Sequence, residues 1–368
     1  MAFIPGMELS RRFYWEAVRP VLDRSWSGLP HTAALIGSGS ETLGFDDEMS
    51  TDHNWGPRLQ LFLRPDDGEG LADEIRAALR HELPHRFLGY STNFSDPDPD
   101  DGGTQGMETS EGGPVNHLVD TTTVSRFFGG YLNFDIDRTV CAADWLTFPQ
   151  QKLRTITSGG IFHDGIGLDS VRARFGWYPP DVWRYLLAAS WARIGQEEHL
   201  MGRAGLVGDE LGSSLIASRL VRDLMGLCFL MERQYAPYAK WFGTAFGQLE
   251  SASVLTDILL AVQGASAWQE RDHWLGEAYG VVAAGHNRLA LTEPMPETPI
   301  NFFGRPFRVM ALQGFAEALL GSVGDAEVAQ IARQRPIGSI DQFSDSTDLL
   351  EAVALRPLLR ALYEPERR

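Results

Sequence analysis

Residues 32–63 read TAALIGSGSETLGFDDEMSTDHNWGPRLQLFL and contain two short apolar runs separated by a turn-rich stretch. The first run, Thr32–Ile36, ends at four small residues, Gly37-Ser38-Gly39-Ser40, and is predicted to be a strand that stops at this turn. The second run, Arg58–Leu63, places a leucine at every other position, which is typical of a strand with one buried face. Two such strands indicate a sheet in the N-terminal half.

The rest of the N-terminal half alternates between helical and extended patterns. Apolar residues at helical spacing predict helices over Met7–Trp26 and Gly70–Leu83. Further strands are expected at His85–Tyr90, Val115–Thr121 and Thr155–His163. Between them, Ser91–Gly113 contains the run SDPDPDDGG and is predicted to be an exposed acidic loop, with a lid over a site as the alternative.

After Pro179 the pattern is helical. Helices are expected at Pro180–Arg203, Asp209–Gln234, Pro237–Leu249, Ser253–Gln263 and Trp268–Leu291, and others follow a proline-rich connection up to Tyr363. We therefore predict an α+β protein, with a mixed sheet and helices in residues 1–175 and an all-α domain in residues 176–368. A chain of 368 residues with 43% hydrophobic side chains has material for two such cores.

The net charge of the chain favours some classes of binding partner over others. It carries 49 acidic and 32 basic residues, a formal net charge of −17. A protein that grips a nucleic-acid backbone needs a positive face, so this charge disfavours DNA or RNA as a partner. A metal–nucleotide complex or a cationic substrate suits the field better.

Two features bear on the cellular compartment. Cys141 and Cys228 each lie in an apolar stretch and are expected to be small buried hydrophobic residues rather than a disulfide or a metal pair. Residues Met1–Ser10 do not resemble a signal peptide, and no apolar run reaches membrane-spanning length. We expect a cytoplasmic protein that has no membrane partner.

The turn after the first strand and the segment before the second carry polar groups suited to a phosphate and a metal ion. Gly37 and Ser38 leave the backbone open to a phosphate group and offer N–H and hydroxyl donors. Asp52 and Asn54 stand one residue apart just before the second strand, so their oxygens are expected on one side. Two such oxygens can hold Mg²⁺ that also binds a nucleoside triphosphate.

A third ligand is expected from Asp120, in the segment HLVDTT. It shares a face of its predicted strand with Leu118 and Thr122. An acid among apolar strand residues needs a cation or a hydrogen-bond donor to offset its burial. The candidate metal ligands are therefore Asp52, Asn54 and Asp120.

The arrangement of Gly37-Ser38, Asp52-x-Asn54 and Asp120 resembles the nucleotidyltransferase superfamily related to DNA polymerase β. Longer segments resemble a family of bacterial proteins, DUF4037, which pairs such a domain with a helical C-terminal region. These segments are STDHNWGPRLQLFL (50–63), DWLTFPQQKL (144–153) and ERQYAPYAKWFGTAF (232–246). The resemblance extends over essentially the whole chain and implies a nucleotidyltransferase fold in the N-terminal half.

The resemblance also implies an activity. A nucleoside monophosphate, with AMP expected, would move from ATP or another nucleoside triphosphate to a hydroxyl of a small molecule or a protein, and pyrophosphate would leave. Asp52 and Asp120 would be the catalytic residues, with Mg²⁺ as cofactor and Asp120 as the base. Gly37 and Ser38 would hold the β- and γ-phosphates, and a cationic acceptor would suit the acidic chain.

Asn54 departs from the family pattern, which has a second acid at this position. An amide oxygen is neutral and binds Mg²⁺ more weakly than a carboxylate does. The departure prompts an alternative, a catalytically degenerate nucleotide-binding regulatory protein. A further alternative is a toxin–antitoxin style transferase that modifies a protein.

Two basic side chains are candidate contacts to the phosphates. Arg58 follows the turn before the second strand. An ion pair is an equal alternative there, since acids lie nearby at Asp46, Asp47 and Glu48. Lys240 begins a helix after YAPY, where it can reach a triphosphate or instead lie along Trp241. Structural roles are expected for three further polar residues, His53, His163 and Asp164.

Overall fold

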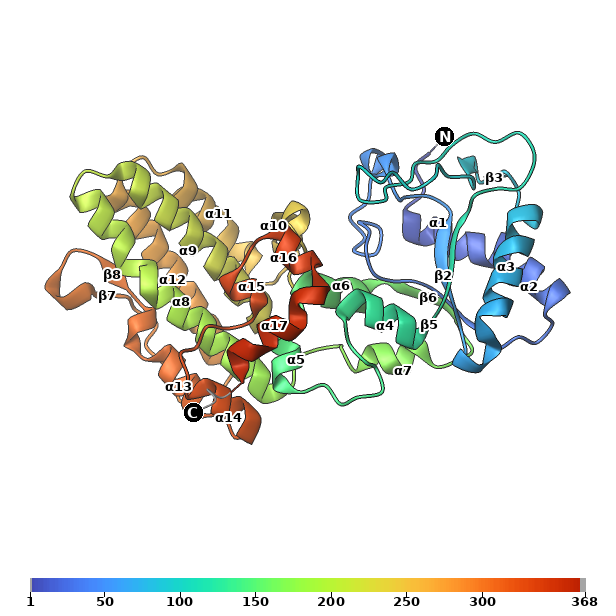
Figure 1. Cartoon of the computed structure of the whole chain (residues 1–368). Coiled ribbons are helices and arrows are strands. Elements are labelled where there is room, and N and C mark those ends of the chain that lie inside the picture. Colours follow the sequence, from blue (N-terminus) through green and yellow to red (C-terminus); the bar gives the residue numbers. More distant parts are fainter. Residues whose placement is uncertain (1, 365–368) are drawn as a thin grey trace. The chain divides into compact units, whose positions relative to one another are not determined.

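The computed structural model describes residues 2–364, which divide into two compact units. The first unit runs up to Thr139 and resumes at Lys152–Gly176, while the second contains Val140–Gln151 and the chain from Trp177 onward. Figure 1 shows the strands of the main sheet in the first unit and the long helices in the second. The predicted division at residue 175 assigns Val140–Gln151 to the first domain, whereas the structure places it in the second unit.

A four-stranded mixed sheet forms the centre of the first unit. Its strands are β1 (Thr32–Leu35), β2 (Arg58–Leu63), β5 (Leu118–Thr123) and β6 (Gly160–Asp164), in the order β5-β2-β1-β6. β1 is antiparallel to both neighbours, and β2 runs parallel to β5 with Gln60 opposite Asp120. The end of β1 therefore lies at the same end of the sheet as the beginnings of β2 and β5. The prediction of an α+β protein with a mixed sheet is confirmed.

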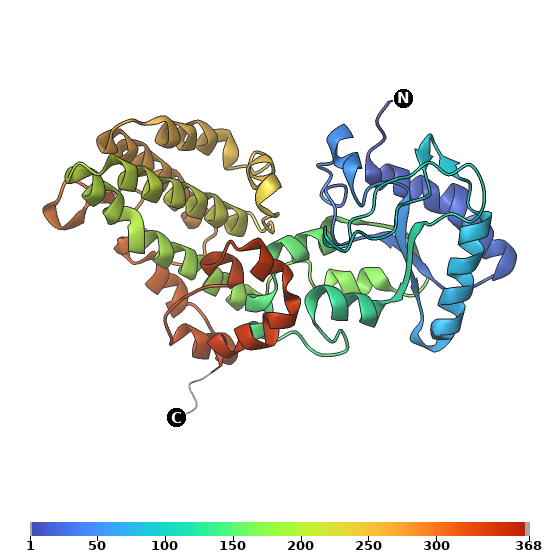
Figure 2. The ribbon, with the colours of Figure 1, turned by 45° about the horizontal axis from the view of Figure 1, so that its top comes forward.

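One face of the sheet is covered by the N-terminal helix and by α3 (Gly68–Glu82). The N-terminal helix is continuous through α1 (Gly6–Phe13), a π-helical section (Tyr14–Val18) and α2 (Arg19–Ser25), as its apolar spacing predicts. Its buried side chains pack with the alternating leucines of β2 and with the inner side of α3. Figure 2 shows these helices together beside the strands.

The opposite face of the sheet packs against α4 (Val124–Leu132), a helix that the sequence pattern does not predict. Phe127 of α4 lies edge-on to Phe62 of β2, with ring centroids 5.6 Å apart. Phe62 and Gln60 alternate with the core-facing leucines of β2. Because Asp120 is in register with Gln60, both residues lie on this second face of the sheet.

The strand predicted over Thr155–His163 is wrong in its first half. Residues 155–158 belong to α6 (Gln150–Ser158), and β6 begins only at Gly160. A Cβ on Gly159 would lie 2.4 Å from the carbonyl oxygen of Leu35, so only glycine fits where the chain passes β1. The β-branched residues of this stretch favour a strand locally, and tertiary packing overrides that preference. Two more helices without a sequence prediction are α5 (Ala142–Thr147) and α7 (Leu168–Ala173).

The segment predicted to be an acidic loop is anchored at its base. The expected strand before it is replaced by a short hairpin of β3 (Arg86–Phe87) and β4 (Tyr90–Ser91). Isolated bridges then join Phe94 to Met107 and Asp98 to Thr104. Phe94 is buried, whereas the acidic tip between the bridges is exposed. The exposed loop is therefore confirmed for residues 96–102, 108–109 and 111–113, while its base is anchored.

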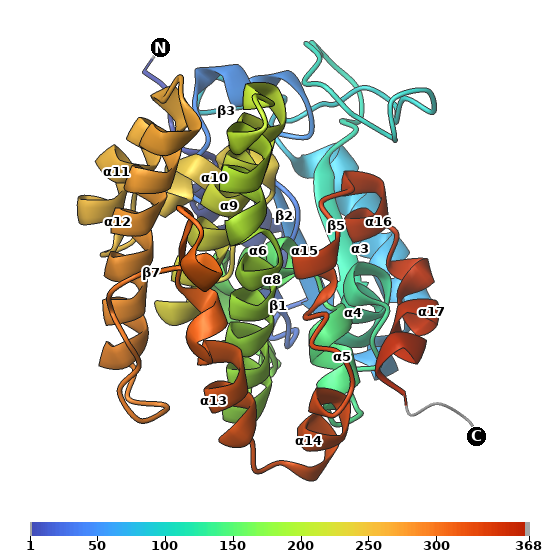
Figure 3. The same ribbon diagram turned by 90° about the vertical axis from the view of Figure 1, so that its left-hand side faces the viewer.

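The second unit is mainly helical (Figure 3). Its long helices are α8 (Pro180–Leu206), α9 (Glu210–Met231), α10 (Ala239–Phe246), α11 (Ala252–Gly264) and α12 (Trp268–Arg288). Shorter helices follow as α13 (Phe315–Gly321), α14 (Ala326–Ala332), α15 (Ile340–Phe343), α16 (Thr347–Glu351) and α17 (Arg356–Arg360). The predicted helices are confirmed, but the prediction of an all-α domain is wrong. Strands β7 (Ile300–Asn301) and β8 (Arg308–Val309) pair antiparallel across the proline-rich connection.

The two cysteines differ in exposure. Cys228 is buried, as expected, whereas Cys141 is half-exposed, and neither forms a disulfide. The thiol of Cys141 lies 3.0 Å from Oδ2 of Asp144. A polar neighbour thus replaces the apolar surroundings that the sequence suggests for this residue. Within residues 2–364, no helix is both long enough and apolar enough to cross a bilayer.

Asp164 ties the end of β6 to β1 and to the following helix, which confirms its structural role. Its carboxylate accepts the hydroxyl of Thr32 at 2.6 Å and the backbone N–H groups of Gly167, Leu168 and Asp169 at 2.9–3.1 Å. Partial burial by itself would raise the pKa of Asp164, but these hydrogen bonds together hold it below its ordinary value.

Asp164→Ala is expected to lower the free energy of unfolding at pH 7 by about 1–2 kcal/mol, the usual cost of losing such a cap. Because the folded-state pKa is lowered, the stabilisation is present above about pH 4 and is lost as the pH falls through that pKa. Urea denaturation at pH 7 and pH 3 measures both effects. Asp164→Asn, which keeps one acceptor oxygen, should lose less, and the same pH dependence in wild type and Asp164→Ala would contradict the assignment.

Candidate functional site

The turn after β1 is a rigid loop built on two glycines. Gly37 and Gly39 have φ values of +86° and +135°, which favour glycine over any residue with a side chain. The Gly37 N–H donates to the carbonyl oxygen of Thr155 at 3.2 Å. The hydroxyl of Thr42 lies 2.9 Å from the Gly37 carbonyl and 2.7 Å from that of Gly39. Ser38 therefore stands exposed on a loop held from both sides.

Arg58, at the start of β2, holds this turn through hydrogen bonds of its guanidinium group. Its Nε donates to Oε1 of Glu41 at 2.7 Å, and its Nη2 donates to the carbonyl of Ser38 at 2.7 Å and to Glu41. The side chain of Glu41 is only 3% exposed, so the pair is shielded from solvent. Arg58 thus forms an ion pair, which was the alternative to a phosphate contact. Its partner is Glu41 and not one of the acids expected from the sequence, Asp46, Asp47 and Glu48. Arg58 therefore contributes to the site indirectly, by fixing the conformation of the turn.

Asp52 and Asn54 do not lie on a strand. Asp52 ends a 3-10 helix (Glu48–Asp52), and its Oδ1 lies 2.8 Å from Nδ1 of His53. Asn54 has a φ of +48°, in the left-handed region that asparagine tolerates better than most residues. The regular alternation expected before β2 is therefore absent, because the chain turns at Asn54 before it extends.

Asn54 binds the base of the acidic loop through two hydrogen bonds. Its N–H donates to the carbonyl oxygen of Gln105 at 2.8 Å, and its side-chain oxygen accepts the Gln105 N–H at 3.0 Å. The amide oxygen predicted as a metal ligand thus has a backbone donor already. An asparagine at this position has a structural explanation in both its backbone conformation and its side chain.

Asp120 lies on the sheet face opposite the main core, beside Gln60. Gln60 extends the sheet toward the turn, because its side chain accepts the Ile36 N–H at 3.1 Å and donates to the Ile36 carbonyl at 2.9 Å. Asp120 is thus about two strand spacings, roughly 10 Å, from the end of β1. Its carboxylate accepts no hydrogen bond from any residue between 2 and 364.

The surroundings of Asp120 change its proton affinity. Asp120 is exposed, so the burial expected for it from the sequence is not found. Partial desolvation by its neighbours still raises the pKa of its carboxyl, and the charges of Arg76 and Arg126 lower it in part. A cation at this position would stabilise the ionised form further. The residues described by the structure contain no group of three His, Cys, Asp or Glu side chains placed to hold a metal ion. Asp52 and Asp120 are therefore not part of such a group of three.

Lys152 is a basic residue near the turn that the motif search missed. It is 4% exposed, and its ammonium lies 4.3 Å from the ring centre of Tyr131 in α4. The same ring borders Gly37, since a Cβ there would lie 3.6 Å from it. The sequence holds a signal for this residue. Of the 32 basic residues only Lys152 and Lys240 are lysines, so both stand out against a background of arginine.

Lys240 lies in the second unit, in the first turn of α10. Its ammonium is 4.9 Å from the ring centre of Trp241, the contact expected if the lysine lies along that ring. A role of Lys240 in phosphate binding stays a prediction.

One comparison with known proteins is informative. Residues 145–242 match a family model described as "Domain of unknown function (DUF4037)". This part of the chain resembles DUF4037. The matched range begins within DWLTFPQQKL and ends within the segment that begins ERQYAPYAKW, two of the stretches on which the resemblance was based, and it contains both lysines. No curated protein and no solved structure matches the chain.

Gly39→Ala should disrupt the turn, because the new Cβ would lie 2.4 Å from Nη2 of Arg58 and 2.5 Å from Oε2 of Glu41. With the added backbone strain at φ +135°, we expect a loss of roughly 2 kcal/mol or more in unfolding free energy. Gly44→Ala is the matched control, since φ there is also positive but no atom lies within 4 Å of the new Cβ. Thermal denaturation of both variants measures the difference, and equal losses would show that the Glu41–Arg58 pair is not constraining.

Asn54→Ala removes the acceptor for the Gln105 N–H and leaves a side chain that is strained at φ +48°. Amide exchange of residues 103–107 should become faster in this variant. Asn54→Asp keeps an oxygen acceptor at the same place and should exchange like wild type. Hydrogen–deuterium exchange measured by mass spectrometry distinguishes them, and unchanged protection in Asn54→Ala would remove the anchoring role.

Proposed function

We propose that the chain is a Mg²⁺-dependent nucleotidyltransferase that moves a nucleoside monophosphate from ATP or another nucleoside triphosphate to a hydroxyl acceptor. The observation that supports this most is the fixed glycine turn at the end of β1, with Ser38 exposed on it and Asp120 in the same sheet, on β5, two strands from β1. Backbone N–H groups of such a loop suit phosphate oxygens. The nucleotidyltransferase fold of this unit is part of the proposal.

In the proposed reaction the acceptor hydroxyl forms a bond to the α-phosphorus, and the bond from that phosphorus to the bridging oxygen of the β-phosphate breaks. Asp120 takes the proton of the hydroxyl, and pyrophosphate leaves with the electron pair. Ser38 and the N–H groups of the turn bind the β- and γ-phosphates, and Lys152 adds positive charge beside Gly37. Bound Mg²⁺ would neutralise phosphate charge.

The oxygen ligands at the site are suited to a cation only in part. No group within residues 2–364 donates a hydrogen bond to the Asp120 carboxylate, and partial desolvation raises its pKa although the charges of Arg76 and Arg126 lower it in part. The side chain of Asp52 is exposed, and its Oδ1 lies 2.8 Å from Nδ1 of His53. Asp52 and Asp120 are therefore the residues that would hold Mg²⁺, with Asn54 as a weaker third.

One observation favours a second candidate, a nucleotide-binding protein without catalysis. The Asn54 amide oxygen is engaged by the Gln105 N–H, which leaves one lone pair for a metal. A neutral and partly occupied ligand would weaken a second metal ion, and transfer would slow while nucleotide binding persisted.

Isothermal titration of ATP is expected to show binding that requires Mg²⁺ and that falls at least tenfold in Asp52→Ala and Asp120→Ala, since each loses a charged ligand. Asp66→Ala, at an exposed aspartate outside the site, should bind like wild type. Unchanged affinity in both site variants would reject the site.

Pyrophosphate release from ATP in the presence of a panel of hydroxyl acceptors separates the two candidates. Release by wild type supports the transferase. Binding without release, with release restored in Asn54→Asp, supports the second candidate, because that variant adds the acid and keeps the contact to Gln105.

A further inference from the structure

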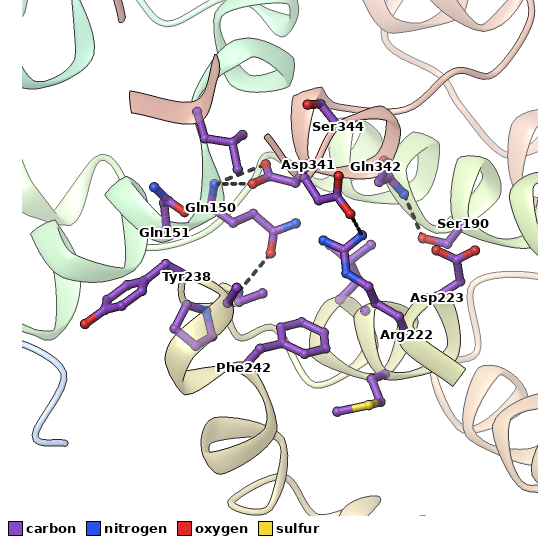
Figure 4. A pocket seen from close by; sticks show the side chains of 18 of the residues that line it. Gln150, Gln151, Ser190, Arg222, Asp223, Tyr238, Phe242, Asp341, Gln342 and Ser344 are labelled. Atoms are coloured by element: carbon purple, nitrogen blue, oxygen red, sulfur yellow. Dashed lines mark hydrogen bonds and ion pairs between the residues drawn. The ribbon is translucent and has the colours of Figure 1, made fainter. Parts of the chain in front are cut away.

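The second unit contains a cavity of about 520 Å³, within the usual range of small-molecule sites. Its walls come from the start of α6, from α8, α9 and α10, and from the segment of α15 and α16 (Figure 4). These elements are distant in sequence, and those between residues 150 and 242 lie inside the range that matches DUF4037. A cavity built by converging segments is a candidate binding site.

The carboxylate of Asp341 faces this cavity. Both of its oxygens lie 3.1 Å from one donor, the backbone N–H of Gln150 at the start of α6. No basic side chain among residues 2–364 forms an ion pair with it. One shared N–H leaves most of the lone pairs of this carboxylate without a donor, and Figure 4 shows the group directed at the Gln150 backbone.

The other charged residues of the wall are paired. Arg193 lies 3.2 Å from Asp223, and Arg222 lies 3.3 Å from Asp345. The lining therefore holds three aspartates and two arginines, and the ionised Asp341 leaves it one negative charge in excess. Asp341 is half-buried, and a carboxylate that is partly removed from water without an ion-pair partner is destabilised, so a cationic ligand would offset that cost.

The wall opposite supplies apolar and aromatic surface. Phe242 lies across the cavity from Asp341 in Figure 4, and Leu230, Met225 and Pro237 line it as well. An aromatic face attracts a cation and also packs against a flat apolar body. The side-chain oxygen of Gln150 accepts the Ala236 N–H at 2.9 Å, which fixes its amide group at the cavity wall.

We propose that this cavity binds a small organic monocation, with its ammonium group on the Asp341 carboxylate and its apolar body against Phe242. The inference is independent of the nucleotide site. A purely structural role for Asp341, as an acceptor for the first N–H of α6, predicts that a neutral amide serves equally well and that the cavity does not discriminate by charge.

The proton affinity of Asp341 supplies a signature. Burial raises its pKa to about 7, while the Gln150 N–H and the charge of Arg222 act in the opposite direction. Asp345, which pairs with Arg222, and the phenols of Tyr178 and Tyr363 are titratable groups near it. The cavity is also lined by Arg193, Asp223 and Tyr238. A carboxyl with a pKa near 7 is about one-tenth ionised at pH 6 and about nine-tenths at pH 8. Cation binding should therefore tighten about tenfold over this interval.

The test uses benzylamine, a monocation over this pH range, and its neutral analogue benzyl alcohol. A monocation avoids the general attraction that a polycation would feel for a chain of net charge −17. Ligand-observed NMR titration of the full chain should show benzylamine binding at least tenfold more tightly than benzyl alcohol at pH 8. Asp341→Asn should abolish both the preference and its pH dependence, while Asp348→Asn, at an exposed acid outside the cavity lining, should keep them.

Equal affinity for the two probes in wild type, or an unchanged preference in Asp341→Asn, would overturn the proposal. If Asp341→Asn does not fold, carbon-detected NMR titration of the wild-type aspartates replaces it. Saturating benzylamine should then lower the pKa of Asp341, and a pKa that does not move would equally overturn the proposal.

Discussion

The shielded ion pair between Glu41 and Arg58 determines the shape of the turn at the end of β1. A carboxylate that is 3% exposed requires its partner, because an unpaired charge in such a place costs several kcal/mol. The pair also dictates glycine nearby, since a Cβ on Gly6 or Gly39 would lie within 2.8 Å of a Glu41 atom. The guanidinium that neutralises Glu41 also holds the Ser38 carbonyl, so burial of one charge fixes the backbone that presents Ser38.

The regular elements of this unit follow from the sequence, whereas its tertiary pairings do not. β2 was predicted at its observed bounds, because alternating leucines report a buried face directly. Arg58 was expected to meet an acid, but the choice of Glu41 depends on how the turn folds back, which spacing does not encode. The strand predicted at residues 155–158 is wrong for a related reason. Their β-branched residues favour a strand locally, whereas in the folded unit they belong to α6 and the chain reaches β1 only at Gly159.

The cavity of the second unit lay beyond sequence analysis altogether. Its central contact joins Gln150 and Asp341, which are 191 residues apart. Gln150 lies in the segment DWLTFPQQKL, but nothing in that segment indicates a contact with Asp341. Asp341 looks in the sequence like an ordinary acid in the first turn of a short helix. Its environment becomes unusual only when α6, α9 and α15 converge, because desolvation is a property of the packed structure and not of the local sequence.

Asn54 affects both the position of the acidic loop and the negative charge beside Asp52. Its contact to Gln105 attaches the acidic loop, with aspartates at 96, 98, 100 and 101, to the chain just after Asp52. A free nucleoside triphosphate approaching these carboxylates would be repelled, whereas a metal-complexed one carries less negative charge. A neutral asparagine beside Asp52 limits the local charge, and an aspartate at 54 would add to it and raise neighbouring carboxyl pKa values. Asn54 thus anchors the loop through its hydrogen bond and, being neutral, adds no negative charge to the proposed site. These two roles explain why asparagine occupies position 54 without requiring that the site be inactive.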